Sequence, residues 1–245
     1  MKFKAPLLIF SLFVLSLLGF KADHCPKAKK DTILIFSLTK GFHHASIADG
    51  IIAIKKLGLT NGFEVDTTTN VNLFTTENLS KYKALVFLSP TGSNVFSDEQ
   101  KQAFKQYINH GGGFVGIHAA TDCNYEWEWY GKMVGGYFVS HPKVQNAKLN
   151  IVAPKNKMMK GLPASWSHTD EWYNFKDFNP EVKVLIKVDE TSYTGGTMKD
   201  DHPISWYHKF EGGKIFYTGL GHTKETYSEE LFLQHLLAGL KWAMD

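Results

Sequence analysis

The sequence has few cysteines and lacks the short motifs that identify several common enzyme classes. Only two of its 245 residues are cysteine, Cys25 and Cys123, which argues against a framework of disulfide bonds. It contains no HExxH zinc motif, paired CxxC motif, Walker phosphate loop or GxSxG nucleophile motif. The glycines Gly111–Gly113 precede an expected strand instead of following it, which is the wrong position for a dinucleotide fingerprint. We therefore expect no nucleotide cofactor.

The sequence also lacks a basic stripe, a low-complexity tract and an internal repeat. Its formal net charge is +3, but Lys2, Lys4 and Lys21 all lie in the first 22 residues, which carry no acid. Without that segment the 27 Lys and Arg residues fall to 24, which equals the number of Asp and Glu residues. A near-neutral chain has no electrostatic footprint for nucleic acid, so we expect no nucleic-acid partner.

The first 22 residues have the pattern of a secretory signal peptide. Two lysines precede an apolar run, Leu7–Phe20, that is followed by a polar stretch. The run is shorter than the ~20 residues that a membrane-spanning helix needs, so we expect no transmembrane span. We predict an exported, periplasmic or extracellular chain with a signal peptide (1–22), a linker (23–31) and a single domain (32–245). A lipid anchor at Cys25 is an alternative, although the two residues before it make a poor lipoprotein signal.

Strand and helix patterns alternate along the domain. Apolar runs and shorter strand-like segments occur at 33–38, 63–68, 84–89, 114–117, 148–152 and 182–188. Helical spacing of apolar residues predicts helices over 44–57, 97–110, 127–134 and 228–242, with Ser97 and Ser228 as N-caps. Segments 203–210 and 214–218 flank a Glu-Gly-Gly turn and predict an antiparallel hairpin. These patterns predict an α/β fold with a mostly parallel sheet, helices on both faces and a C-terminal hairpin.

Histidines follow three of the expected strands. His44, His118 and His222 each come soon after a strand, and ligands of such sheets bind beyond the carboxyl ends of the strands. A single histidine is more often an ordinary hydrogen-bonded polar residue, so the shared position of the three carries the prediction. Imidazole exchanges protons near neutral pH and binds divalent metals. We expect the three rings to meet at one edge of the sheet.

Carboxylates and aromatic residues stand near these histidines. Asp122, four residues after His118, can orient that ring or accept a hydroxyl of the substrate. The segment Asp170-Glu171-Trp172-Tyr173 combines two acids with two aromatic faces, which suits sugar rings that stack on aromatics. The alternative is that its two aromatic residues pack in the core. Cys123 acts as a nucleophile only if a base lies within reach, so we expect an inert thiol.

Five segments, in order along the chain, carry a likeness to a known family. They are TKGFHHASI (39–47), GGGFVGIHAATD (111–122), WEWYGKMVGGYFVSHP (127–142), TDEWYNF (169–175) and PISWYHKFEGGKIFYTGLGHT (203–223). Together with the closing GLKWA they resemble the ThuA-like, or trehalose utilisation, family over about residues 32–244. The resemblance implies a flavodoxin-like three-layer sandwich that is related to class I glutamine amidotransferases.

The resemblance also assigns His118 to a tight turn. In the amidotransferases a Gly-hydrophobic-Cys sequence puts a nucleophilic cysteine between strand and helix, and Gly116-Ile117-His118 looks like the same elbow. Because histidine replaces the nucleophile, we do not expect amidotransferase activity. The sequence departs from the family pattern at Lys155–Lys160, where the family has a His-Pro pair. The site residues that the resemblance implies are His44, His118, Asp122, His141, Asp170, Glu171, Tyr173 and His222.

The family is linked to disaccharide metabolism, with proposed action on sugars oxidised at carbon 3. The resemblance implies an exported enzyme that acts on a disaccharide or 3-keto-glycoside by acid–base or metal-assisted elimination, isomerisation or hydrolysis. The expected roles are catalysis by His118, Asp122, Glu171 and His222, substrate contact by His44, His141, Asp170, Trp172 and Tyr173, and binding of zinc or a similar divalent metal by His44, His118 and His222. One alternative is a non-catalytic carbohydrate-binding protein that uses Trp127, Trp129, Trp172 and Tyr173 as stacking platforms. Another is a partner-binding subunit without a sugar ligand.

Overall fold

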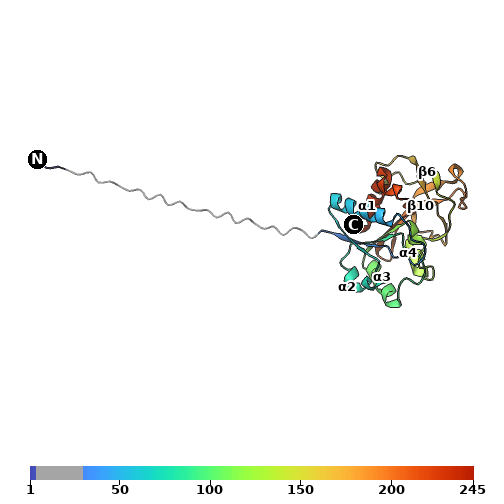
Figure 1. Ribbon diagram of the computed structural model, residues 1–245, viewed down its shortest axis with the longest axis horizontal. Coiled ribbons are helices and arrows are strands. Elements are labelled where there is room, and N and C mark those ends of the chain that lie inside the picture. The colour runs from blue at the N-terminus through green and yellow to red at the C-terminus, as the bar shows by residue number, and fades with distance from the viewer. Residues whose placement is uncertain (4–29) are drawn as a thin grey trace.

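The computed structural model describes residues 1–3 and 30–245 (Figure 1). The predicted signal peptide, apart from its first three residues, and most of the predicted linker, with Cys25, lie outside the described residues. Within the described part of the chain, no helix has both the length and the apolar character that crossing a membrane requires.

A nine-stranded sheet forms the centre of the domain, in the order β2-β1-β3-β4-β11-β10-β9-β6-β7. The five strands from β2 to β11 run parallel to one another, and the rest continue the sheet in antiparallel pairs. β5 and β8 pair separately as a small antiparallel ribbon. The strands are β1 Thr32–Phe36, β2 Glu64–Thr68, β3 Ala84–Leu88, β4 Gly113–Ile117, β5 Tyr137–Ser140, β6 Gln145–Ile151, β7 Ser165–Asp170, β8 Asn174–Lys176, β9 Lys183–Asp189, β10 Pro203–Phe210 and β11 Gly213–Thr218.

Helices cover both faces of the parallel half. In Figure 1, α1 and the red C-terminal α5 lie on one side of the sheet, and α2 and α3 lie on the other. On the α5 side Gly239 lets the helix approach the Phe216 ring, which a Cβ at that position would meet. The helices are α1 Ile47–Asn61, α2 Thr76–Leu79, α3 Asp98–Asn109, α4 Glu128–Val134 and α5 Glu230–Met244. The predicted α/β sandwich with a large, mostly parallel sheet is confirmed.

Local sequence explains the central elements. Every residue of β3 and β4 is buried, as their continuous apolar runs predict. Ser97 caps α3 as predicted, because its hydroxyl accepts the amide of Gln100 and the Gln100 side chain accepts the Ser97 amide. Rings from the strands and from α3 then pack together: Phe87 lies 5.3 Å from Phe104 between centroids. This core fixes the carboxyl ends of the parallel strands.

Two helix starts differ from the predictions. Ser228 does not cap α5: its hydroxyl donates to the Glu225 carbonyl at 2.8 Å within a preceding 3-10 turn, and the helix begins two residues later. The helix predicted from His44 begins at Ile47, which leaves His44 in the loop after β1. The antiparallel part of the sheet also extends beyond the predicted hairpin, because β9, β6 and the unexpected strand β7 continue it. The strands β5 and β8 of the separate ribbon were not expected either.

Candidate metal centre

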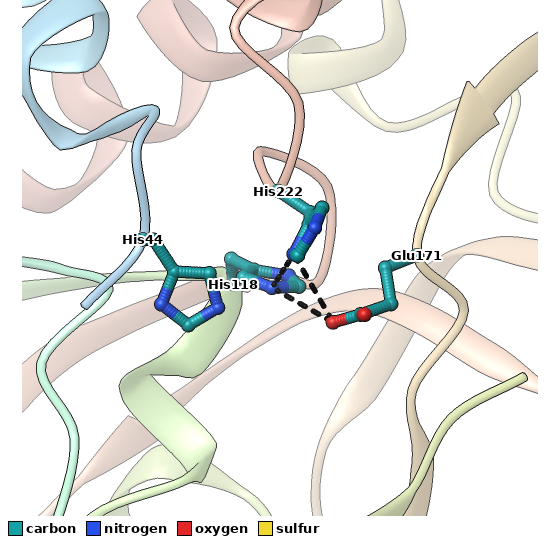
Figure 2. A group of neighbouring side chains, drawn as sticks. All are labelled: His44, His118, Glu171 and His222. Carbon is teal, nitrogen blue, oxygen red and sulfur yellow. Dashed lines mark hydrogen bonds and ion pairs between the residues drawn. The ribbon is translucent and has the colours of Figure 1, made fainter. Parts of the chain in front are cut away.

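Four side chains from four different loops meet at the carboxyl end of the sheet. His44 follows β1, His118 follows β4, Glu171 follows β7 and His222 follows β11. Each offers one ligand atom, and these atoms all lie within 4.8 Å of one another. Figure 2 shows His118 and His222 in the middle of the group, with His44 and Glu171 on either side. The structure therefore brings the three predicted histidines together and adds Glu171 to them.

The turn after β4 aims His118 at the other residues. His118 has a positive φ of 48°, and a Cβ on Gly116 would come 3.0 Å from the Tyr217 ring and 3.1 Å from Ala120. Both features indicate a sharp turn between β4 and the 3-10 helix that follows it. A non-glycine residue at positive φ is uncommon in proteins and is found at such constrained turns. His118 Nδ1 donates to the Gly219 carbonyl at 2.9 Å, which leaves Nε2 unprotonated in the neutral ring. This nitrogen points at His222 and Glu171.

Three donor atoms form a nearly equilateral triangle. His222 Nδ1 lies 3.2 Å from His118 Nε2 and 3.1 Å from Glu171 Oε2, and the third side measures 3.5 Å. Donors bound ~2.0–2.1 Å from a tetrahedral zinc ion lie about 3.3–3.4 Å apart, so the triangle matches three ligands of one ion. The same distances also suit hydrogen bonds through a single proton on His222. A metal ion and this proton would compete for one position.

His44 closes the group from the side opposite Glu171. Its ring is 3% exposed and meets the rings of His118 and His222 edge to face, with centroids 4.7 Å and 5.3 Å away. Its Nδ1 is buried and has no hydrogen-bond partner within the described residues. Burial and the neighbouring His118 and His222 lower its pKa to about 3, so the ring is neutral at physiological pH. A neutral imidazole can bind a metal, and the ring nitrogen that faces His118 in Figure 2 is the candidate ligand atom.

Glu171 is an ionised carboxylate that connects the group to His141. Burial alone would raise its pKa, but the neighbouring His118 and His222 together outweigh this effect and lower the pKa to about 2. The pKa of His222 changes in the opposite direction. Burial lowers it, but the hydrogen bond to Glu171 and the charges of Glu171 and Asp170 together outweigh burial and raise the pKa above its ordinary value. Glu171 Oε1 contacts Nδ1 of His141 at 2.9 Å. His141 follows β5, and its side chain is 41% exposed, so it stands at the solvent side.

Asp170 anchors the loop that carries His222. Its fully buried carboxylate accepts the backbone amides of Gly221 at 2.7 Å and His222 at 3.0 Å. Behind it, His168 Nε2 lies 3.2 Å from Asp170, and His168 Nδ1 lies 2.7 Å from Glu229. The structure thus gives Asp170 backbone partners and buries it, where substrate contact had been expected. Sequence reasoning missed His168, because β7 has too few apolar residues to be recognised as a strand. It therefore also missed Glu229, the partner of His168.

The remaining predicted site residues make different contacts. The Tyr173 ring lies 4.2 Å from the His118 ring, so it forms one wall of the site. Asp122 accepts the Tyr125 hydroxyl at 2.6 Å, and burial raises its pKa. The hydrogen bond that orients His118 goes to a backbone carbonyl and not to Asp122. Trp172 is fully buried and donates to the Gln145 carbonyl, so its ring offers no face to a sugar.

Trp127 and Trp129 lie beside α3 and away from the histidines. Their rings stack on each other at 5.1 Å, and Lys101 and Lys105 of α3 lie over them. Trp129 also donates to Glu211 in the β10–β11 turn. These contacts give the pair a packing role against α3 and the β10–β11 turn, where the alternative hypothesis had them as stacking platforms for sugar.

Cys123 is predicted to resist alkylation in the folded protein. It is fully buried, and burial raises the pKa of its thiol to about 12, so almost no thiolate forms near neutral pH. Iodoacetamide at pH 8 should leave the peptide that contains Cys123 unmodified, as measured by mass spectrometry. The same reagent in guanidinium chloride should modify it fully. Equal labelling in both conditions would contradict the buried position.

Comparison with known families assigns this fold to a family. The sequence profile of the ThuA family, described as trehalose utilisation, matches residues 32–243. The chain belongs to the ThuA family. No curated protein sequence is detectably similar to it. This family links the protein to carbohydrate utilisation.

Solved structures share the ThuA fold. A ThuA-like protein of Bacteroides uniformis is 27% identical, with a TM-score of 0.74 over 92% of this chain and 95% of its own. One of Parabacteroides merdae is 21% identical, with a TM-score of 0.74 over 88% and 90% of the two chains. A β-galactosidase of Bacillus circulans shares the fold alone, at 12% identity and a TM-score of 0.56 over 88% of this chain and 30% of its own.

Proposed function

We propose that this ThuA protein is an exported, metal-dependent enzyme that acts on a disaccharide or glycoside with a keto group at carbon 3. The observation that carries the proposal is the triangle of donors from His118, Glu171 and His222, with a ring nitrogen of the neutral His44 beside it. The family supports a carbohydrate substrate, and the leader-like first 22 residues support export.

The donor set suits zinc or a similar divalent ion. Three imidazoles and one carboxylate are common ligands of zinc, and two histidines with one carboxylate also bind other transition metals. His118 is already fixed by its bond to the Gly219 carbonyl, which is how metal-binding histidines are generally oriented. The side chain of His222 is 22% exposed, which leaves a way in from solvent.

The proposed chemistry is acid–base catalysis beside a carbonyl group. A bound divalent ion would polarise the keto oxygen and so acidify the neighbouring C–H bond. In an elimination, the proton leaves carbon 2, its electron pair forms a double bond to carbon 1, and the glycosidic oxygen leaves with its bonding pair and gains a proton. His141 is suited to move these protons, because it is exposed and lies next to Glu171. The Tyr173 ring borders the same space, 4.2 Å from the His118 ring.

The sugar-binding alternative receives less support. Of its four proposed stacking platforms, Trp172 is buried and Trp127 and Trp129 pack beside α3, so only Tyr173 lies at the histidines. A binding protein also has no use for a buried carboxylate surrounded by histidines. The geometry therefore favours catalysis.

The test combines metal analysis with turnover. We expect the purified mature protein to contain about one zinc or similar ion per chain, and to convert trehalose oxidised at carbon 3. Chelation should abolish turnover, and added zinc should restore it. Metal affinity should fall as the pH drops through the raised pKa of His222, because a proton competes with the ion for that ring nitrogen. Full turnover in a metal-free sample would overturn the metal-dependent mechanism, and sugar binding without turnover would favour the binding protein.

A further inference from the structure

Phe42 is the one exposed aromatic residue among residues 30–245, with 65% of its surface accessible. Its ring meets the His44 ring edge to face, with centroids 4.9 Å apart and an angle of 82°. His44 in turn belongs to the histidine and carboxylate group. An exposed phenyl ring therefore stands at the rim of the site, one residue away from the donor atoms.

The loop around Phe42 is held firmly in place. The Thr91 hydroxyl donates to the Phe42 carbonyl at 2.9 Å and accepts the Gly41 amide at 3.2 Å. The Lys40 amide donates to the Thr91 carbonyl at 2.9 Å. These bonds join the loop after β1 to the loop after β3. Because these bonds fix the backbone around Phe42, the loop itself holds the Phe42 side chain in its exposed position.

We propose that Phe42 is the platform on which the second sugar ring of the substrate stacks. This inference rests on the proposed function and names the part of the substrate that the rim recognises. One face of a pyranose ring carries mainly C–H bonds, which pack on an aromatic face, while its hydroxyl groups stay in water. Phe42 lies beside His44, and Figure 2 shows His44 on the opposite side of the group from Glu171. A substrate of two rings would place its keto ring over the donors and its other ring on Phe42.

A single isolated ring fits a sugar better than a protein partner. The other exposed large apolar residues of this domain are aliphatic, and Ile52 and Leu59 lie on α1. Protein interfaces bury contiguous surfaces with several anchoring residues, whereas one phenyl ring matches one pyranose face. The competing explanation is that Phe42 only shields His44 from water. A leucine at position 42 would keep such a shield but lose the flat face.

The experiment compares two sugars on the metal-loaded mature protein. The probes are trehalose oxidised at carbon 3 and glucose oxidised at carbon 3, with affinities measured by calorimetry. Phe42→Ala and Phe42→Leu should weaken the disaccharide roughly tenfold and change the monosaccharide less than about twofold, while Phe42→Tyr should bind both normally. Leu59→Ala changes another exposed apolar residue, on α1; it is the matched control and should change neither affinity.

Each outcome decides a separate point. Unchanged disaccharide affinity in Phe42→Ala would overturn the platform while leaving the proposed function intact. Normal affinity in Phe42→Leu with a loss in Phe42→Ala would show that Phe42 is only a shield, which also overturns it. If the unmodified protein binds and converts neither sugar, the proposed function fails, and the platform fails with it. Metal content in all four variants should equal that of the unmodified protein.

Discussion

His118→Asn is expected to lose the bound metal ion and to turn over a keto-disaccharide at least about 10³-fold more slowly, since several kcal/mol of transition-state stabilisation would be lost. Asparagine tolerates a positive φ, so the elbow after β4 should keep its shape. Its amide is a poor ligand for zinc and does not reach the position of the imidazole Nε2. Metal analysis and steady-state turnover of the purified variant measure the two effects.

His43→Ala is the matched control for this prediction. His43 is also a histidine of a strand-end loop, but it is exposed and pairs with Thr39 at 3.1 Å. The control should keep both metal and turnover. A His118→Asn protein that retains one ion per chain would show that the ion binds elsewhere, and full turnover in that variant would remove His118 from the mechanism.

The parallel half of the fold and three of the site residues were predictable for the same reason. β1, β3 and β4 are continuous apolar runs, so their ends are visible in the sequence. Carboxyl ends of neighbouring parallel strands lie at one edge of a sheet, so residues that follow them converge. His44, His118 and His222 met for this reason, although they are far apart in the chain.

The antiparallel half of the sheet could not be predicted in full, because tertiary contacts decide which of its residues are buried. β7 reads SWSHTD, in which Trp166 is the only large apolar residue, and its burial is decided by pairing with β6. β7 is the last strand in the sheet order, yet its end meets the loop after β11, where Asp170 accepts the Gly221 amide. This contact between the two segments brings Glu171 to the histidines, and no local sequence pattern indicates it.

The direction of side chains at this strand end was equally hidden. Asp170, Glu171, Trp172 and Tyr173 are consecutive, and the sequence treated them as one sugar-binding surface. In the structure Glu171 and Tyr173 face the histidines, while Asp170 binds backbone amides and Trp172 enters the core. Knowing that a segment lies at the site therefore does not reveal which of its residues reach the ligand.

Asp170→Asn should destabilise the metal-free protein by about 3–5 kcal/mol and weaken zinc binding roughly 10–100-fold. The amide keeps the shape of the side chain, but its NH₂ group cannot accept the bonds that one carboxylate oxygen takes from Gly221 and His168. The Gly221 amide would then be buried without a partner, and the loop that carries His222 would lose its anchor. Urea unfolding of the chelated protein measures the stability, and competition with a zinc indicator measures the affinity.

The stability difference between this variant and the unmodified protein should be greatest between about pH 4 and pH 6.5. Burial opposes ionisation of Asp170, but His168, His118 and the Gly221 amide together outweigh burial and lower its pKa, so its contribution disappears as the pH falls through that value. Burial likewise opposes protonation of His168, but Asp170 and Glu229 raise its pKa, so its contribution disappears as the pH rises through that value. Asp201→Asn removes an exposed ion pair with Lys187 and should cost at most about 1 kcal/mol. Equal losses in the two variants, or a difference independent of pH, would contradict the role of Asp170 as a buried anchor.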